Sequence, residues 1–510
     1  MMKESMTLSL NAKAARARRD LRRMPLMALL ALLVSALGCA VGPNYRRPSA
    51  PIATVYKEMP AANSPEANQW KEAQPSDTAI RGKWWEVYED PQLNPLEEQV
   101  NISNQNVLAA EQQYRAARDA MRIARSNLFP LVTAGPTITN SRTSQGAGTA
   151  GVSAGGTSHT VYDLSADASY TLDVWGAIRR QVTATARTAQ ASYAQLENVR
   201  LIMQATLAEA YFQLHGTDAE QQLLTKTVAS YQDYLQLTQD RFKAGVASGA
   251  DVAQAETQLS SAQAELIDLG VARAQFEHAI AVLTGKPPAE LTVPNGAITA
   301  KMPIIPVAVP STLLERRPDI ASAERTMAAA NEQIGIAQSA YYPTVSLGAT
   351  FGVQSTDPSN WFSWPSRFWS LGPQILEIVF NGGKRHAQVD QAKALYESNV
   401  ADYRQTVLTA FQQVEDELAA LRILSQEANA ADATVRAAQQ NLDISTYQYK
   451  AGTVAYLQVI TAQTAALQAE VTALNILTRR MVASVSLIEA LGGGWDAKQL
   501  PGNNDILHGK

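Results

Sequence analysis

Side chains that commonly perform catalysis or bind metals are few and scattered in this 510-residue sequence. The single cysteine excludes an internal disulfide and a cysteine-based zinc site. No two histidines are four residues apart, the spacing that would place a pair on one face of a metal-binding helix. The five histidines are His159, His215, His278, His386 and His508. The segments LTGKPP and NGGKRH do not fit the phosphate-binding loop pattern. Glu415 and Glu417 lie in a long helical pattern, and we interpret them as a solvated face. These observations give an enzymatic function little support.

The single cysteine, Cys39, is placed for covalent lipid attachment. Residues 1–38 have the features of a signal peptide, because seven basic side chains precede the apolar run 26–37, which is too short to span a membrane. The sequence ALGC is similar to the cleavage motif of bacterial lipoproteins, although Ala36 stands where leucine is usual. Ala40 after the cysteine implies delivery to the outer membrane. The alternative is a small buried hydrophobic residue.

The remaining chain repeats itself, as a search for internal repeats shows. RFKAGVASGADVAQAETQLSSAQAEL (241–266) is similar to QYKAGTVAYLQVITAQTAALQAEV (448–471), with Gly245 and Gly452 offset by 207 residues. NLFPLVTAGPTIT (127–139) is similar to AYYPTVSLGATFG (340–352), with Pro130 and Pro343 offset by 213. We therefore predict two structural repeats, 91–285 and 312–491, joined by a Pro-rich linker at 286–311. Residues 39–90 form an N-terminal arm and equatorial segment, and 492–510 form a tail.

Each repeat carries a pair of segments in which apolar and polar residues alternate. In the first repeat, Tyr162, Leu164 and Ala166 alternate with Asp163 and Ser165, and residues 344–353 of the second repeat follow the same pattern. A period of two residues predicts strands with one apolar and one polar face. We place strand hairpins at 131–174 and 344–379.

Very long helices follow the strands. Residues 177–244 and 383–451 contain no proline and little glycine. At 1.5 Å per residue, each helix would reach roughly 100 Å, too long for one compact core. A coiled-coil seam, with steps of four and three residues, runs along the second of them at Val407, Phe411, Val414, Leu418 and Leu421. Helices at 249–284 and 455–491 would return antiparallel after short turns.

Four strands of membrane-spanning length cannot lie in a bilayer alone, because their edges would leave unpaired N–H and C=O groups in hydrocarbon. Four strands are also too few to close a useful barrel. We therefore predict an α+β membrane protein, a trimeric 12-stranded β-barrel with four strands per chain, continued by a long α-helical coiled-coil barrel. The alternative is a soluble four-stranded sheet.

The polar face of this barrel would line a lumen. It carries Asp163 and Asp167, so a trimer would place six carboxylates near the outer mouth and give a local cation preference. The alternative is solvated charge in a wide pore, with little effect on selectivity. An aromatic cluster at the second hairpin is typical of a membrane-interface belt, or of a core inside the loop: Trp361, Phe362, Trp364, Phe368 and Trp369.

Several blocks of the sequence resemble one protein family. TLLERRPDIASAERTMAAANEQIGIAQSAYYPTVSLGATFG (312–352) resembles the most characteristic block of the outer-membrane factors of tripartite efflux systems. CAVGPNYRRPSAP (39–51) resembles the start of their lipoprotein branch, the NodT type. YTLDVWGAIRRQV and VFNGGKRHAQVDQAKALY match the two strand-to-helix junctions. The resemblance covers nearly the whole chain after residue 38, and it implies a homotrimer with its barrel in outer-membrane lipid and its helices in the periplasm.

The resemblance implies a channel that passively conducts drugs or other solutes. A periplasmic adaptor and an inner-membrane pump, expected to be of the RND type, would deliver them. It implies no cofactor apart from the covalent lipid on Cys39. The net charge of −4 gives no footprint for nucleic acid. The alternatives are a type I secretion channel and a trimeric structural coiled-coil lipoprotein.

The resemblance also implies roles for the helix turns, which in the family form the periplasmic tip where the adaptor docks. The matching residues are Arg241, Gly245, Val246, Ala247, Ser248, Gly452, Thr453, Val454 and Ala455. Alternatively, they are turn residues without a partner. Family members often close the tunnel with an acidic residue at the position of Thr461, so a different gate is expected here. Tyr456 and Leu457 are candidates for steric closure, and Asp251 and Glu256 for a charged gate.

Overall fold

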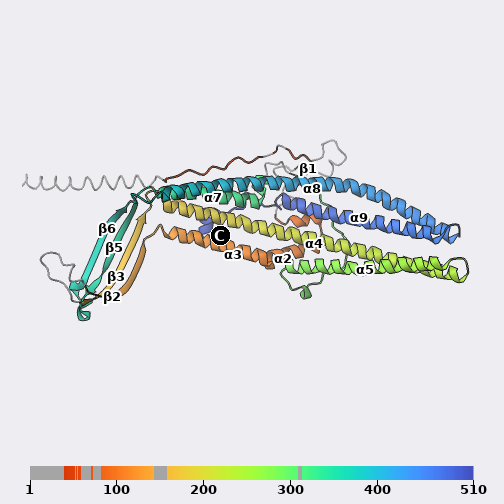
Figure 1. Ribbon diagram of the computed structural model, residues 1–510, viewed down its shortest axis with the longest axis horizontal. Coiled ribbons are helices and arrows are strands. Elements are labelled where there is room, and N and C mark those ends of the chain that lie inside the picture. Colours follow the sequence, from red (N-terminus) through yellow and green to blue (C-terminus); the bar gives the residue numbers. More distant parts are fainter. Residues whose placement is uncertain are drawn as a thin grey trace, which may run out of the picture.

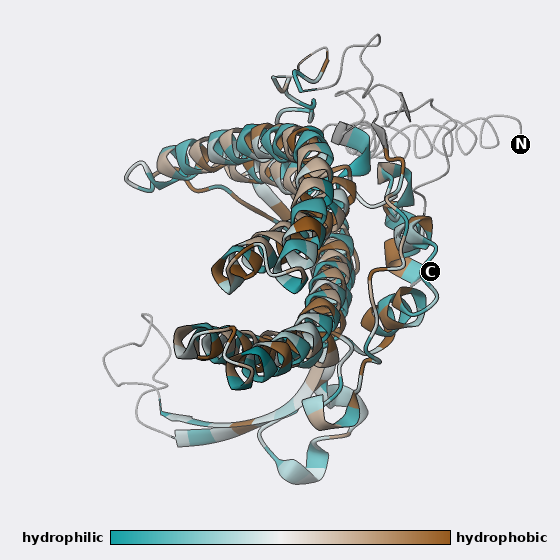
Figure 2. Cartoon of the chain, turned by 90° about the vertical axis from the view of Figure 1, so that its right-hand side faces the viewer, coloured by the Kyte–Doolittle hydropathy of each residue, from teal (hydrophilic) through white to brown (hydrophobic). Residues whose placement is uncertain are grey.

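The computed structural model describes residues 40–51, 53, 55–58, 71–72, 82–142, 158–307 and 313–508. The predicted signal peptide and Cys39 lie outside these residues. A four-stranded sheet forms one end of an elongated molecule, and long helices extend away from it (Figure 1). Seen end-on, the helices form a curved wall with a concave side (Figure 2).

The same order of elements occurs twice. The first set is α3 (Gln105–Ser126), β2 (Leu131–Arg142), β3 (Ser158–Leu172), α4 (Ala177–Lys243) and α5 (Gly249–Leu283). The second is α7 (Pro318–Ser339), β5 (Thr344–Ser355), β6 (Arg367–Leu376), α8 (Lys384–Lys450) and α9 (Tyr456–Ala490). Corresponding helices have equal lengths of 22, 67 and 35 residues. The chain therefore builds two units of the same design, in the positions that the sequence repeat predicts.

Short elements connect and cover these units. A shorter helix precedes the first 22-residue helix of each repeat: α2 (Leu93–Ser103) before α3 and α6 (Leu313–Arg316) before α7. A small parallel pair joins β1 (Lys71–Glu72) to β4 (Pro306–Val307), so the Pro-rich linker contacts the N-terminal segment. The remaining elements are η2 (Trp84–Tyr88), η4 (Pro288–Glu290), η6 (Pro358–Asn360), η7 (Trp364–Ser366), η8 (Ala497–Gln499) and α10 (Asn503–His508).

The long strands form one antiparallel sheet in the order β2-β3-β5-β6. Its register places apolar residues beside apolar residues, as in the row Ala134, Ala166, Phe351 and Trp369. The neighbouring row is polar and contains Thr133, Asp167, Thr350 and Ser370. Because side chains alternate between the two faces of a strand, the sheet has one apolar and one polar face.

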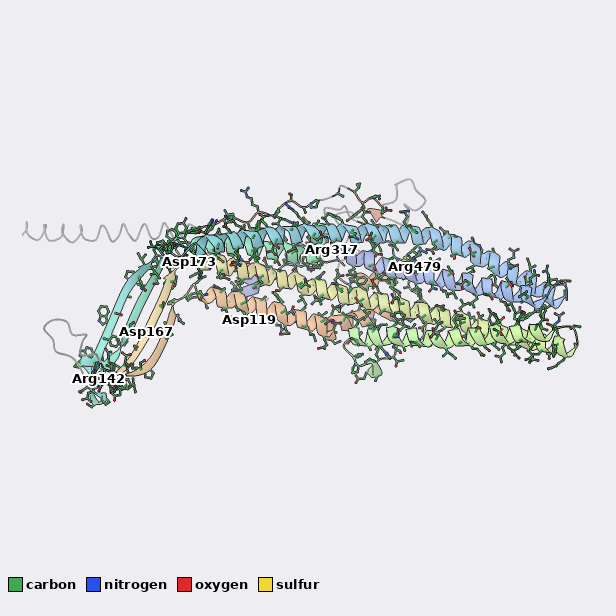
Figure 3. The ribbon with its side chains drawn as sticks, viewed as in Figure 1. Asp119, Arg142, Asp167, Asp173, Arg317 and Arg479 are labelled. Carbon is green, nitrogen blue, oxygen red and sulfur yellow. The ribbon has the colours of Figure 1, made fainter. Side chains whose placement is uncertain are left out.

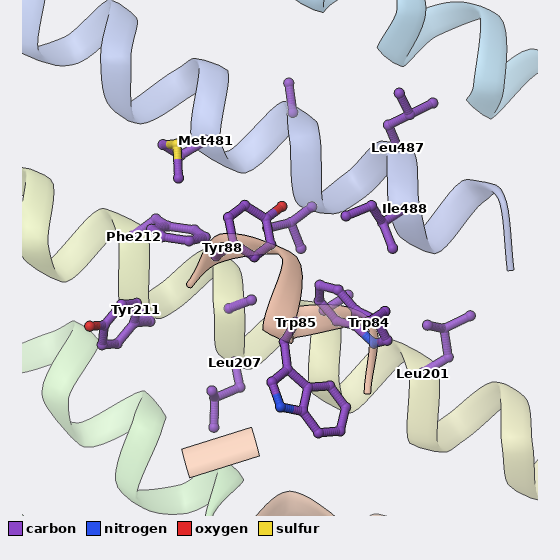
Figure 4. Close-up of a cluster of buried hydrophobic side chains, with 14 of the residues drawn as sticks. Trp84, Trp85, Tyr88, Leu201, Leu207, Tyr211, Phe212, Met481, Leu487 and Ile488 are labelled. Carbon is purple, nitrogen blue, oxygen red and sulfur yellow. The ribbon is translucent and has the colours of Figure 1, made fainter. Parts of the chain in front are cut away.

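The core lies where η2 inserts its aromatic side chains between α4 and α9 (Figure 4). Trp84, Trp85 and Tyr88 are almost completely buried, with exposed fractions of 1%, 2% and 0%. The hydroxyl groups of Tyr88 and Ser484 are 2.8 Å apart, and Trp84 Nε1 donates to Gln204 over 3.1 Å. These contacts join the two repeats at mid-length.

A buried ion pair holds the linker to the first repeat. Arg273 Nε on α5 donates to Asp218 Oδ1 on α4 over 2.7 Å, and the Gly296 backbone N–H donates to Asp218 Oδ2 over 3.0 Å. Arg273 also donates to the Val293 carbonyl over 2.8 Å. His215 Nδ1 lies 3.4 Å from Asp218 Oδ2. The linker therefore has a fixed path across α4 and α5.

Helix α9 is the one described helix whose length and apolar composition would suit a membrane span. It packs instead along α8 and α4, and its buried residues belong to two of the hydrophobic clusters. Packing between helices explains its apolar composition.

Candidate functional site

The sheet has the dimensions and surface of a membrane-spanning element. A 12-residue strand such as β5 is about 40 Å long at 3.3 Å per residue. When tilted by about 40°, it spans the roughly 30 Å hydrocarbon core. No other part of the described chain covers the apolar face, where Phe351 is 63% and Trp369 75% exposed. This face is therefore suited to contact lipid.

Aromatic residues gather at the sheet end that lies far from the helices. Trp361 lies at 5.8 Å from Tyr162 between ring centroids, and its Nε1 donates to the Val353 carbonyl over 3.3 Å. Phe362 and Trp364 remain 69% and 77% exposed. Trp361 thus anchors the loop against the sheet, as expected of a loop core, whereas the exposed rings are placed as in an interface belt.

Asp163 and Asp167 lie on the polar face, as the alternation predicts. Thr350 Oγ1 donates to Asp167 over 2.7 Å, and Ser165 Oγ donates to Asp163 over 2.8 Å. Asp163 is the sixth and Asp167 the tenth residue of the 15-residue β3 counted from its outer end, and Asp167 lies near mid-sheet (Figure 3). The expected position of both carboxylates at the outer mouth is therefore wrong for Asp167.

The predicted tip residues form two tight helix reversals at the other end of the molecule. Gly245 and Gly452 have φ of +75° and +76°, which glycine adopts without strain. In the first turn, Val246 is 67% exposed. In the second, Thr453 Oγ1 donates to the Gln448 carbonyl over 2.9 Å, and Ala455 is the N-cap of α9. Ala247 and Ser248 complete the first turn. Val454 packs against a hydrophobic cluster that contains Tyr449 and Tyr456.

Tyr456 is not available as a steric plug, which corrects that expectation. Its side chain is 2% exposed and packs with Ala255, Tyr449 and Val459 between the two helix hairpins. The phenol ring is needed there to fill space between helices that are distant in sequence. Leu457, in contrast, is 58% exposed.

A contact that the sequence did not reveal joins the two tips. Arg241 Nη1 donates to the Tyr449 carbonyl over 2.6 Å, and its guanidinium lies 4.4 Å from the centre of the Tyr449 ring. Nearby, the hydroxyls of Tyr234 and Thr446 are 2.8 Å apart. These bonds connect the end of α4 to the end of α8. The tyrosine at 449 in the motif QYKAG was the available signal.

The other gate candidates have local roles. Asp251 forms a capping box with Ser248, because each side chain binds the backbone N–H of the other residue. Thr461 Oγ1 donates to the Leu457 carbonyl over 2.9 Å and is exposed. Glu256 is also exposed. Asp251 therefore stabilises the start of α5, while Glu256 and Thr461 remain accessible.

Glu415 and Glu417 do not form the solvated face that the sequence indicated. Glu415 accepts the backbone N–H groups of Lys57 and Glu58 over 2.7 and 3.0 Å, because the N-terminal arm runs along α8. Burial, followed by repulsion from Glu209, raises the pKa of Glu417 to about 7. The same two causes raise the pKa of Glu489 to about 7. Three adjacent helices thus place carboxyl groups together at mid-length.

Among the residues that the structure describes, no group of three or more histidine, cysteine or acidic side chains could hold a metal ion. His215 is 3% exposed and contacts the linker at Gly296, with Nδ1 3.1 Å from the carbonyl oxygen. It is a structural residue of the linker contact.

A sheet of membrane length with a bare apolar face, joined to helices of roughly 100 Å, defines the class of outer-membrane channel proteins. The sequence profile described as "Outer membrane efflux protein" matches residues 96–286 and 309–493, one segment in each repeat. The chain belongs to the outer membrane efflux protein family, which is a family of transport proteins.

Individual relatives agree along nearly the whole chain. It is 31% identical to the "Probable efflux pump outer membrane protein TtgC" of Pseudomonas putida, over 92% of this chain and 96% of the relative. It is 30% identical to outer membrane protein OprJ of Pseudomonas aeruginosa, over 93% and 97%. The solved structure of the outer-membrane channel OprN matches with a TM-score of 0.80 at 29% identity, covering 90% of this chain and 100% of that one.

Proposed function

We propose that three copies of this chain form the outer-membrane channel of a tripartite efflux pump. The observation that carries the proposal is the four-stranded sheet. Its edge strands β2 and β6 each have one unpaired edge beside a bare apolar face. Unpaired backbone groups are not tolerated in hydrocarbon. All strands alternate in direction, so β6 of one copy can pair antiparallel with β2 of the next. Three copies supply twelve strands.

The channel conducts solutes passively, and the energy comes from an inner-membrane pump of the RND type through a periplasmic adaptor. No catalytic group or cofactor is required in such a role. Relatives are named for antibiotic and toluene efflux, which supports drugs and small apolar solutes as cargo. A strain that lacks this chain should become more susceptible to part of a broad panel of toxic compounds. Unchanged susceptibility to every compound, with adaptor and pump present, would contradict efflux and favour type I secretion or a structural role.

Asp163 and Asp167 give the lumen a cation preference. In the trimer six carboxylates line the barrel, and no arginine or lysine lies on the polar face of the described strands. Asp163→Asn together with Asp167→Asn should shift the single-channel reversal potential in a KCl gradient toward zero, because cations lose their local attraction. The single variants should shift it less. An unchanged potential in the double variant would leave these carboxylates without a role in selectivity.

The tips carry out two tasks, adaptor docking and closure. Docking uses the exposed turn residues around Val246 and Thr453. Closure uses the Arg241–Tyr449 contact, which ties the α4–α5 hairpin to the α8–α9 hairpin, with Leu457, Glu256 and Thr461 accessible at the same level. The charge-assisted bond and the ring contact together restrain the tip.

Arg241→Ala should raise the single-channel conductance severalfold, because both contacts with Tyr449 are lost and the hairpins can separate. Lys243→Ala is the matched control, since Lys243 is 71% exposed and its ion pair is with Asp240 of its own helix. If the Arg241 variant conducts like the Lys243 variant, the contact does not restrain the gate.

Cys39 carries the lipid of a bacterial lipoprotein. The first described residues support this, because the Val41 N–H donates to the Trp175 carbonyl over 3.0 Å, directly after β3 at the inner end of the sheet. A lipid on the preceding residues would enter the inner leaflet there. Fatty-acid labelling of the protein should disappear in Cys39→Ser while efflux declines only mildly, because a shared barrel inserts without the lipid. Persistent labelling of the variant would exclude Cys39.

A further inference from the structure

The charged side chains of the sheet are separated by face. Among the described strand residues, the carboxylates Asp163 and Asp167 lie on the polar face, whereas Arg142 and Arg367 lie on the apolar face. Arg142 is the outermost residue of β2 and Arg367 the outermost residue of β6. Arg142 is placed at the sheet end that lies far from the helices (Figure 3). Both guanidinium groups therefore occupy the outer rim of the lipid-facing surface.

Closure of the barrel brings the two arginines together, a step that rests on the proposed trimer. Arg142 and Arg367 lie on the two edge strands of the sheet, β2 and β6, so they are far apart within one chain. Across the four strands, the paired residues place Arg367 of β6 level with Pro136 of β2. Pro136 lies six residues before Arg142, so β2 extends six residues farther than β6 at the outer end. A tilted barrel requires such a stagger between its first and last strands. When β6 pairs with β2 of the next copy, the stagger continues and the two outer ends meet at one seam.

The surroundings of these arginines suit an anionic headgroup. The Arg367 guanidinium lies 3.9 Å from the centre of the Trp364 ring, and both side chains are exposed. Asp357, the one acidic residue between β5 and β6, accepts bonds from the Ser359 N–H and hydroxyl over 2.9 and 2.8 Å. No carboxylate of the described residues of β2, β3, β5 and β6 lies on the apolar face.

An arginine that faces lipid is costly unless its charge reaches the interface and finds a partner there. Guanidinium groups bind phosphate through paired N–H donors, and exposed aromatic rings favour the same interfacial depth. We propose that Arg142 of one copy and Arg367 of the neighbouring copy form a binding site for the phosphate groups of outer-leaflet lipids, one at each seam of the trimer.

The test uses the purified full-length trimer and lipid A that carries both phosphates as the probe. Arg142→Gln together with Arg367→Gln should weaken lipid A binding about tenfold or more, because two charge-assisted contacts are lost. The single variants should be intermediate. Arg479→Gln is the control, since Arg479 is 62% exposed on α9 and should have no effect. Lipid A without phosphates should bind the wild type as weakly as it binds the double variant.

A second arm separates a lipid site from a site for free phosphate. Inorganic phosphate in large excess should leave lipid A bound, because the acyl chains contribute to lipid binding. Its displacement would assign the site to free phosphate and overturn the proposal. Unchanged lipid A binding in the double variant, or equal binding of both forms of lipid A, would also overturn it.

The seam itself is tested with Arg142→Cys and Arg367→Cys in one chain. A short bifunctional thiol reagent should link neighbouring copies into a covalent trimer, and neither single variant should be linked into one. The native mass and conductance of each sample keep the two proposals distinct. A conducting trimer without cross-linking or phosphate-dependent binding overturns the lipid site alone, whereas a monomer without conductance overturns the proposed function as well.

Discussion

Replacing Ala166 with arginine should abolish assembly of the protein in the outer membrane. Ala166 lies at mid-length of β3, on the apolar face, between Ala134 and Phe351. An arginine that faces lipid at the centre of the bilayer costs about 2–4 kcal/mol. The trimer carries this cost three times, so folded trimer should be almost absent from purified outer membranes, as measured by heat-modifiable migration in gels.

Ser165→Arg is the matched control for this variant. Ser165 precedes Ala166 in the same strand but lies on the polar face, beside Gly135 and Gly352 and bonded to Asp163. In a water-filled lumen an arginine there should be tolerated, and the trimer should assemble. Equal assembly of both variants would mean that the apolar face does not contact lipid. Equal loss would mean that the strand tolerates no large side chain.

Asp218→Ala should be the most destabilising substitution in the helical part. Asp218 is 1% exposed and binds Arg273, the Gly296 N–H and His215. Its removal takes the closer of two counter-charges from the mostly buried Arg273 guanidinium, which keeps only Glu277 at 3.4 Å. Breaking a buried ion pair typically costs about 3–5 kcal/mol. Thermal unfolding followed by circular dichroism should show a clear decrease of the midpoint. Asp240→Ala is the control and should leave the midpoint nearly unchanged, because the Asp240 side chain is 57% exposed and its ion pair with Lys243 lies at the surface.

The contribution of Asp218 should also depend on pH. Burial alone would raise its pKa, but bonds from His215, Gly296 and Arg273 outweigh burial and lower it from the ordinary 3.8. A carboxyl group whose pKa is lower in the folded state contributes full stability above its unfolded pKa and loses it as the pH falls through the folded value. The stability difference between wild type and Asp218→Ala should therefore be constant near neutral pH and shrink below about pH 4. A difference that does not change with pH would indicate lost packing instead of lost charge.

The long elements could be predicted because their signals are local. The expected helices 177–244 and 383–451 end within one residue of α4 and α8, and the strand hairpins contain all four strands. A break in helical pattern at a glycine and a period of two residues are properties of neighbouring positions. The repeat doubled each of these signals.

Side-chain environments could not be predicted in the same way, because they depend on which helices pack together. Tyr456 appears exposed at a turn until Tyr449, seven residues earlier and across the reversal, covers it. Glu417 appears solvated until Glu209 and Glu489 approach from two other helices. The partners of Asp218 lie 55 and 78 residues away along the chain.

Single-channel recording in planar bilayers tests the central claim most directly. The purified protein should insert as a trimer and give discrete conductance steps, small in the wild type and severalfold larger in Arg241→Ala. A channel that is closed at its tip and continuous through the membrane predicts both results. Absence of conductance steps in both proteins, although each is a folded trimer, would contradict the account and favour a structural lipoprotein.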